Sequence, residues 1–184
     1  VPYYYYRLNA DGSYSNGSGC GNETDSEAPM FKKYMIETLK HWMLDYHING
    51  FRFDLMGLHS KETMAEIYKE LSAIDSNVLV YGEPWTGGDA RVKNGCTGSV
   101  PSEAYGVGAF DDDFRDAIKG AEFGGFNAGE VQGVYNSDGI SAGLIGESGK
   151  NSRNPTDFIG LGLHYVECHD NFTLFDKLVY SLKD

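Results

Sequence analysis

The sequence predicts an α/β fold in which helices alternate with the strands of a parallel sheet. Two observations lead to this prediction. Apolar residues recur at helical spacing in two segments, which begin near Ser26 and at Ser60, and a short apolar run follows each of them. The order helix, strand, helix, strand is typical of βα units, whose strands are parallel and whose crossovers are right-handed.

The N-terminal region is expected to be irregular before the first helix begins. Residues 1–25 are rich in Gly, Asn, Ser and Tyr, which favours a long loop. A helix then starts near Ser26, because Pro29 is tolerated in a first turn and apolar residues recur at steps of three and four as far as Tyr46.

Two buried strands and a second helix are predicted next. Residues 50–57 are short, aromatic and bounded by glycines, which indicates a strand. Ser60 suits the N-cap of a helix whose apolar pattern stops at Asn77. The run 78–81 is continuously apolar, as parallel strands covered on both faces tend to be.

The C-terminal half has a weaker pattern that returns to alternation at its end. Residues 84–108 are long and Gly-rich, and a helix over 111–121 is opened by three acidic residues. Residues 122–160 read as an insertion with one or two short helices. A last strand over 163–168 and a helix over about 174–182 complete the prediction.

Composition supports one sizeable core and excludes two classes of partner. The chain has 184 residues, of which 41% are hydrophobic, and its formal net charge is −12. Nucleic acid and anionic lipid both require a basic surface, and the 15 Lys and Arg residues do not cluster. A neutral polymer such as a sugar chain is compatible with this charge.

Cysteines and hydropathy give little further information. Cys20, Cys96 and Cys168 have no paired spacing, so we expect free thiols. No apolar run is long enough to span a membrane, and the first residues do not look like a signal peptide. Localisation therefore stays open between cytoplasmic and secreted.

Carboxylates follow three of the predicted strands. Residues two apart in a strand share a face, so Arg52 and Asp54 should point the same way. Glu83 follows the second strand, and His169 and Asp170 follow the last. Parallel strands bring their carboxyl ends to one edge, where βα barrels build active sites, so we expect these side chains to converge.

Such a set suits retaining glycoside hydrolysis. This chemistry needs an ionised carboxylate that attacks the anomeric carbon and a protonated one, roughly 5 Å away, that donates to the leaving oxygen. Asp54 suits attack because Arg52 would keep it ionised. Glu83 suits the acid because an apolar neighbour such as Trp85 would favour its protonated form. Asp170 could accept hydrogen bonds from sugar hydroxyls.

Three motifs carry a resemblance to a known family. The segments GFRFDLMG, YGEPW and YVECHDN, in this order, resemble three of the four short regions that mark the α-amylase superfamily of glycoside hydrolases. More narrowly, FDLMG, YGEPW and the upstream YYYYRLNADGSYSNGSGCGN are similar to type I pullulanases, the bacterial starch-debranching enzymes. The match covers nearly the whole chain and is weakest over about 122–160.

The resemblance implies a reaction and residue roles. It implies cleavage of α-1,6-glucosidic bonds in pullulan, branched dextrins and starch, with Asp54 as nucleophile, Glu83 as acid/base and Asp170 as transition-state stabiliser. It also assigns substrate-binding positions, which are Arg52, His169, Trp85, Leu55 and Asn22. Cys168 departs from the family pattern, where Ser is expected.

The fold that the resemblance implies is a partial (β/α)₈ TIM barrel. Such a barrel typically needs about 250 residues. We therefore expect residues 1–184 to be a fragment of a single catalytic domain, roughly strands four to seven with their helices, lacking strands one to three and the last strand. Open sheet edges would result, and we expect the isolated chain to be inactive.

Other interpretations remain open. The enzyme could be an α-1,4-acting or isoamylase-like relative, or a non-catalytic glucan-binding protein on the same fold. Residues 16–22 could line the substrate cleft or form a plain turn-rich loop, and the tyrosines at 3–6 could stack on sugars or pack as an edge. No metal or other cofactor is indicated. Asp111, Asp112 and Asp113 could bind a structural calcium ion, but at a helix start they more often complement the dipole.

Overall fold

The computed structural model describes residues 3–98, 106–122, 127–145 and 160–182. Four strands form a parallel sheet in the order β1-β2-β3-β4. Their bounds are β1 Gly50–Phe53, β2 Leu79–Gly82, β3 Gly108–Asp111 and β4 Gly162–His164. The predicted α/β class with a parallel sheet is therefore confirmed.

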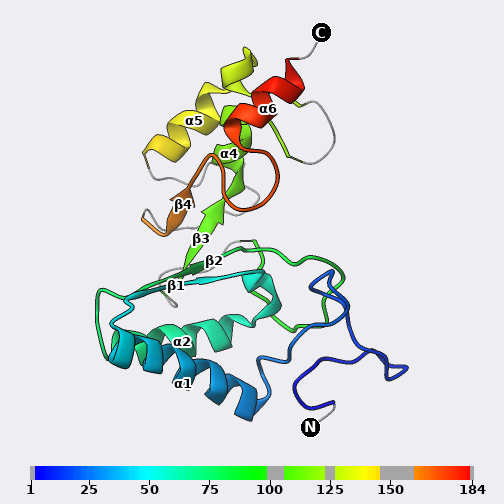
Figure 1. The fold of residues 1–184 in the computed structure, drawn as a ribbon, viewed down its shortest axis with the longest axis vertical. Coiled ribbons are helices and arrows are strands. Elements are labelled where there is room, and N and C mark those ends of the chain that lie inside the picture. Colours follow the sequence, from blue (N-terminus) through cyan, green and yellow to red (C-terminus); the bar gives the residue numbers. More distant parts are fainter. Residues whose placement is uncertain (1–2, 99–105, 123–126, 146–159, 183–184) are drawn as a thin grey trace.

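The helices form two groups along this sheet. Figure 1 shows α1 and α2 beside β1 and β2, whereas α4, α5 and α6 gather around β3 and β4. The helix bounds are α1 Pro29–Tyr46, α2 Lys61–Ser72, α4 Asp112–Lys119, α5 Ser137–Leu144 and α6 Leu174–Ser181. Two short 3₁₀ helices, η1 Met56–Leu58 and η2 Glu130–Gln132, complete the order. None of the helices in the described ranges has the length and apolar character that a membrane crossing requires.

The predicted helices are confirmed, and their ends have identifiable causes. Pro29 lies in the first turn of α1, and His47 ends it in the left-handed conformation. Ser60 caps α2 by accepting a hydrogen bond from the Thr63 amide at 3.1 Å. Asp111 caps α4 by accepting hydrogen bonds from the amides of Asp113 and Phe114. The helix was predicted to begin at Asp111, but it begins one residue later, at Asp112.

The core lies between the α1–α2 pair and the sheet. Residues in this cluster with no measurable exposure include Met56, Met64, Ile67, Leu71 and Val107. They come from η1, from one face of α2 and from the residue before β3. The apolar residues at helical spacing in α2 therefore form one buried face, as predicted, and this face packs the helix against the sheet.

Two strand predictions were wrong in part. The sequence missed β3, because Gly108–Asp111 contains one large apolar residue and lies beside a Gly-rich stretch, although all four residues are buried. The last strand is Gly162–His164 rather than 163–168, because the chain leaves the sheet at Tyr165. Asp170 therefore follows a loop and not the strand itself.

A third prediction, that β2 is covered on both faces, was also wrong. Val80 is 4% exposed, but Leu79 on the opposite face is 66% exposed. On the face opposite Val80, the described residues cover Tyr81 in part, beside Phe110, and leave Leu79 exposed. Of the weakly patterned region 122–160, η2 and α5 are the expected short helices, and residues 123–126 and 146–159 lie outside the described residues.

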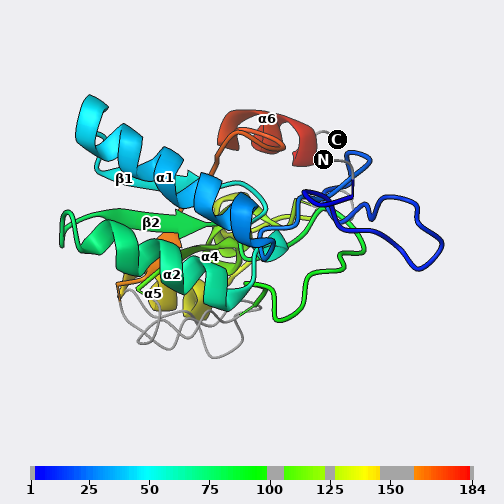
Figure 2. The same ribbon diagram turned by 90° about the horizontal axis from the view of Figure 1, so that it is seen from below.

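The irregular N-terminal region, predicted over residues 1–25, is confirmed for residues 3–25 and extends to Ala28, since α1 begins at Pro29. It contains isolated bridges between Tyr6 and Thr24 and between Leu8 and Tyr14. Figures 1 and 2 both show this loop beyond the carboxyl end of β2, at the same end of the sheet as the segment that follows β2. The loop is therefore placed to affect whatever lies at that edge.

Candidate active site

The register of β1 and β2 brings two of the predicted carboxylates to one edge. Phe53 pairs with Gly82, so Asp54 and Glu83 leave the ends of neighbouring strands together. The amide of Glu83 donates to the carbonyl of Phe53 at 3.1 Å, which extends the ladder to the site itself. The parallel pairing of β1 and β2 thus fixes the backbone from which both carboxylates project.

Arg52 bridges these two carboxylates. Its Nη1 donates to Asp54, and its Nη2 lies 2.5 Å from Glu83 Oε1. The sequence had assigned Arg52 to Asp54 alone. Partial burial lowers the pKa of Arg52, but the hydrogen bond to Asp54 and the charge of Glu83 outweigh burial and raise it above the ordinary value. The guanidinium also lies 5.4 Å from the centre of the Phe110 ring.

The contacts of Glu83 are polar, which differs from the apolar setting predicted around it. The residue is 4% exposed, and its Oε2 accepts a hydrogen bond from the Leu55 amide at 2.7 Å. Leu55 has φ 45°, a strained value for a residue with a side chain, and this conformation is the one in which its amide reaches Glu83. Trp85 lines the same cavity, with its ring 6.5 Å from that of Phe110.

Gly57 joins the segments that follow the two strands. Its amide lies 3.1 Å from the carbonyls of both Glu83 and Trp85. A Cβ at this position would lie 2.4 Å from the Trp85 carbonyl oxygen, a distance that no side chain tolerates. Glycine is therefore required here, and the close contact holds the turn after Asp54 against the turn after Glu83.

His169 and Asp170 approach the same place from the loop after β4. His169 Nε2 lies 3.4 Å from Asp54 Oδ1 and 3.6 Å from Asp170 Oδ1. Asp54, Glu83 and His169 each offer an atom within 4.8 Å of the others. The structure thus brings together all three predicted carboxylates, with Asp170 linked to the other two through His169.

A cavity of about 540 Å³ opens at this edge. Its lining includes five of the predicted site residues: Leu55, Glu83, Trp85, His169 and Asp170. The opposite wall was missed by the sequence analysis and includes Phe110, Asp112, Arg115, Lys119, Glu122 and Tyr165. Asp112, Arg115, Lys119 and Glu122 recur at three- and four-residue steps along and just beyond α4, and this spacing was the available signal for a shared face.

Asn22, predicted to contact substrate, is not brought to the cavity. It is exposed, its backbone carbonyl accepts a hydrogen bond from Ser18, and it is absent from the described lining. The turn-rich loop to which it belongs meets the cavity at a different point. The Gly87 amide donates to the Gly17 carbonyl at 2.9 Å, and Gly87 lines the cavity.

The donor set of Asp54, Glu83 and His169 could geometrically hold a metal ion. Arg52 pairs with both carboxylates, and its guanidinium would repel a cation placed between them.

Two further histidines are buried or partly buried away from the three carboxylates. His164 Nε2 lies 3.2 Å from Asp111 Oδ2, whereas the buried Nδ1 of His59 has no hydrogen-bond partner among the described residues, and burial lowers the pKa of His59 to about 4. Asp111 caps a helix, which is the reading that the sequence favoured over calcium binding. All three cysteines are free, as predicted, and the Cys168 sulfur lies 3.5 Å from His169 Nδ1.

Comparisons with known proteins give a consistent result. No family profile matches the chain. The pullulanase of Bacillus subtilis (strain 168) is 31% identical over 189 residues, which covers 99% of this chain and 26% of the relative. The chain thus spans about a quarter of the length of this relative.

Solved structures agree with the sequence matches. The pullulanase from Bacillus acidopullulyticus has a TM-score of 0.89 at 40% identity, over 99% of this chain and 22% of that one. A mutant pullulanase from Paenibacillus barengoltzii, complexed with maltotetraose, has a TM-score of 0.85 at 40% identity, over 97% of this chain and 28% of that one.

Proposed function

Since this chain belongs to the pullulanases and matches one segment of their length, we propose that it carries the catalytic carboxylates of a starch-debranching glycoside hydrolase. In this proposal residues 1–184 lie within a single catalytic (β/α)₈ barrel and supply roughly strands four to seven. The four parallel strands, with helices in the connections from β1 to β2 and from β3 to β4, are consistent with that architecture.

The proposed reaction retains the configuration of the anomeric carbon. Asp54 attacks this carbon while Glu83 gives its proton to the leaving glycosidic oxygen, so a covalent glycosyl-enzyme forms. Water then attacks the intermediate as Glu83 takes a proton back, and the bond to Asp54 breaks. The observation that carries this proposal is the separation of the two carboxylates, whose nearest oxygens lie within 4.8 Å. Retaining enzymes hold these groups about 5–5.5 Å apart, whereas inverting enzymes leave about 6.5–9.5 Å for a water.

Arg52 links the two carboxylates to which the proposal gives the reacting roles. Its guanidinium pairs with both Asp54 and Glu83, so it fixes their relative position at the ends of β1 and β2.

His169 and Asp170 are proposed to hold the sugar. Both are more than half exposed at the side chain and both line the cavity, so their polar atoms are accessible to hydroxyl groups. Asp170 also places negative charge near the ring, which stabilises the positive charge that develops in the transition state.

The proposed substrates contain α-1,6-glucosidic bonds, as in pullulan, branched dextrins and starch. Support comes from the name shared by the relatives and from the maltotetraose bound in one of them. The cavity contributes Trp85, Phe110 and Tyr165, with neighbouring ring centres 6.5 and 5.0 Å apart. These ring pairs are tilted and edge-to-face, and an aromatic face that lines a cavity suits the apolar face of a glucose ring.

Product analysis tests this proposal. The complete gene product that contains this chain should release maltotriose from pullulan, and the first-formed product should have the α configuration by proton NMR. Panose or isopanose would instead indicate an α-1,4-acting relative. A first-formed β anomer would refute the retaining mechanism, and an absence of hydrolysis would favour a glucan-binding protein.

A further inference from the structure

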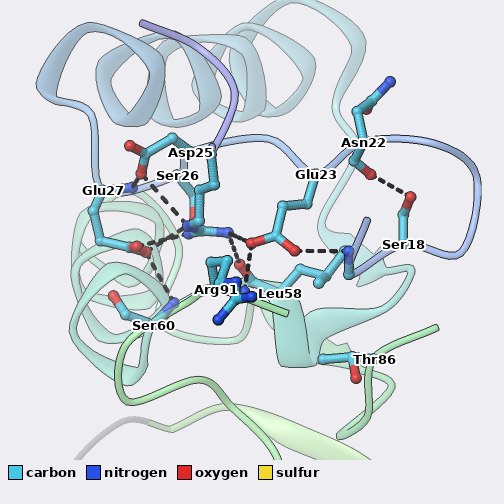
Figure 3. A network of polar contacts seen from close by, with 12 residues as sticks. Ser18, Asn22, Glu23, Asp25, Ser26, Glu27, Leu58, Ser60, Thr86 and Arg91 are labelled. Carbon is cyan, nitrogen blue, oxygen red and sulfur yellow. Dashed lines mark hydrogen bonds and ion pairs between the residues drawn. The ribbon is translucent and has the colours of Figure 1, made fainter. Parts of the chain in front are cut away.

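The buried carboxylate of Glu23 lies outside the catalytic edge and joins three segments of the chain. Its side chain has no measurable exposure. Oε2 accepts a hydrogen bond from the Gly17 amide at 2.8 Å, and Oε1 accepts one from the Arg91 amide at 2.9 Å. Oε1 also lies 3.4 Å from Nη1 of Arg7. The proposed reaction uses none of these groups, although the network is extensive (Figure 3).

Arg7 has other ion-pair partners besides Glu23. The guanidinium also pairs with Glu27 at 2.6 Å and with Asp25 at 3.7 Å, and it donates to the Leu58 carbonyl at 2.9 Å. Removing the charge of Glu23 therefore leaves Arg7 with two carboxylates and avoids an unpaired buried cation. What Glu23 adds is its pair of hydrogen bonds to backbone amides.

The contact at Gly17 connects Glu23 to the wall of the cavity. Gly17, held by Glu23, accepts a hydrogen bond from Gly87 at 2.9 Å, and Gly87 lines the cavity next to Trp85. The two loops are in backbone contact here, since a Cβ on Gly87 would lie 2.2 Å from the Ser18 carbonyl oxygen. Glu23 holds the far end of the same segment directly, at the Arg91 amide, so residues 87–91 are attached to Glu23 through Gly17 at one end and directly at the other.

We propose that Glu23 is a positioning residue that holds residues 87–91, and through Gly87 the cavity wall formed by Trp85, Thr86 and Gly87, and thereby controls the affinity for an α-glucan. The inference rests on the function proposed above. Asp54 and Glu83 are held separately, by β1, β2 and Arg52. Loss of the Glu23 contacts should therefore weaken substrate binding and leave the reacting carboxylates in place.

The test is Glu23→Gln in the complete gene product. The amide keeps the size of the side chain, but it has one acceptor oxygen for two backbone N–H groups. We expect KM for pullulan to rise about tenfold, the effect of losing one hydrogen bond to a charged group, with kcat changed by less than about threefold. Backbone amides of Gly17 and Arg91 should exchange hydrogen faster. Asp11→Asn is the matched control, because Asp11 is an exposed carboxylate of the same loop that contacts Ser13.

Glu23→Asp separates reach from charge. It keeps the negative charge beside Arg7 but is one methylene shorter, so it cannot reach both amides and should remain impaired. Full recovery in Glu23→Asp, an unchanged KM in Glu23→Gln, or a fall in kcat alone would each overturn the proposal. Hydrogen exchange needs no turnover. If the wild-type protein fails to cleave pullulan, the proposed function fails, while faster exchange at Gly17 and Arg91 still supports the positioning role and unchanged exchange overturns it.

Discussion

Replacing Arg52 by Lys separates the charge of this residue from its ability to hold two carboxylates at once. The guanidinium gives one nitrogen to Asp54 and another to Glu83. An ammonium group is a compact charge without the planar fork, so Arg52→Lys can keep one pair well formed but not both. The substitution therefore breaks the bridge while leaving a cation at the end of β1.

The size of the effect follows from the exposure of the two partners. The Glu83 side chain is 5% exposed, so its charge-assisted hydrogen bond is worth about 1.5–3 kcal/mol. The Asp54 side chain is 65% exposed, and such a pair contributes only about 0.2–1 kcal/mol. At about 1.4 kcal/mol for each factor of ten, loss of the Glu83 contact lowers kcat/KM about 10- to 100-fold.

Steady-state rates on pullulan, measured for the complete gene product, test this prediction. Thermal unfolding of each variant is the control for folding, and Arg52→Gln is the companion variant that removes the charge as well. We expect kcat/KM of Arg52→Lys to fall about 10- to 100-fold and that of Arg52→Gln to fall further. Both rates are measured at a temperature at which thermal unfolding shows the variant to be folded. A wild-type kcat/KM in Arg52→Lys would show that the bridge between the two carboxylates is unnecessary. Equal rates for Arg52→Lys and Arg52→Gln would show that the positive charge is unnecessary.

Three further predictions concern the reaction and the stability of the fold. Asp54→Asn should lower turnover by several orders of magnitude, because the covalent intermediate cannot form, and an undiminished rate would refute its role as nucleophile. Glu83→Gln should recover in part on aryl glycosides whose leaving groups need no proton, and equal impairment on good and poor leaving groups would refute the acid role. Burial lowers the pKa of His59 from 6.5 to about 4, so below pH 6.5 the unfolded chain binds a proton that the folded chain does not. The free energy of unfolding should therefore fall by up to about 3 kcal/mol as the pH drops from about 6.5 to about 4. Urea unfolding at both ends of this range should show that His59→Phe removes this part of the loss; an equal loss in both proteins would contradict the assignment.

The part of the site that depends on strand ends was predictable from the sequence. Asp54 and Glu83 directly follow short apolar runs, and parallel strands bring such positions to one edge. The shared role of Arg52 was not predictable, because it depends on the register in which Phe53 pairs with Gly82. Local pattern contains no information on that register.

The cavity wall formed by β3 and α4 was not predicted, because β3 was not recognised as a strand. Gly108–Asp111 is a fully buried strand with a single large apolar side chain, so its composition resembles the Gly-rich segment before it. Phe110, which supports Arg52, was therefore assigned to no element. The charged side chains of Arg115 and Lys119 are buried, at 8% and 1% exposure, although such residues normally predict a solvated helix face.

The buried Glu23 network also had no sequence signature. Its partners come from the loop before α1, from η1 and from the segment after β2, and its bonds go mostly to backbone groups. Backbone donors and acceptors are the same in every sequence, so their convergence becomes visible only in the folded chain.

Covalent trapping at Asp54 is the most direct test of the account. The complete gene product would be incubated with a fluorinated α-glucosyl fluoride, whose fluorine slows hydrolysis of the glycosyl-enzyme, and then digested and analysed by mass spectrometry. We predict that the mass of one fluorinated glucosyl group is added to the peptide that contains Asp54, and that fragmentation assigns it to this side chain. Labelling of Glu83 instead, or inactivation without any covalent adduct, would contradict the account.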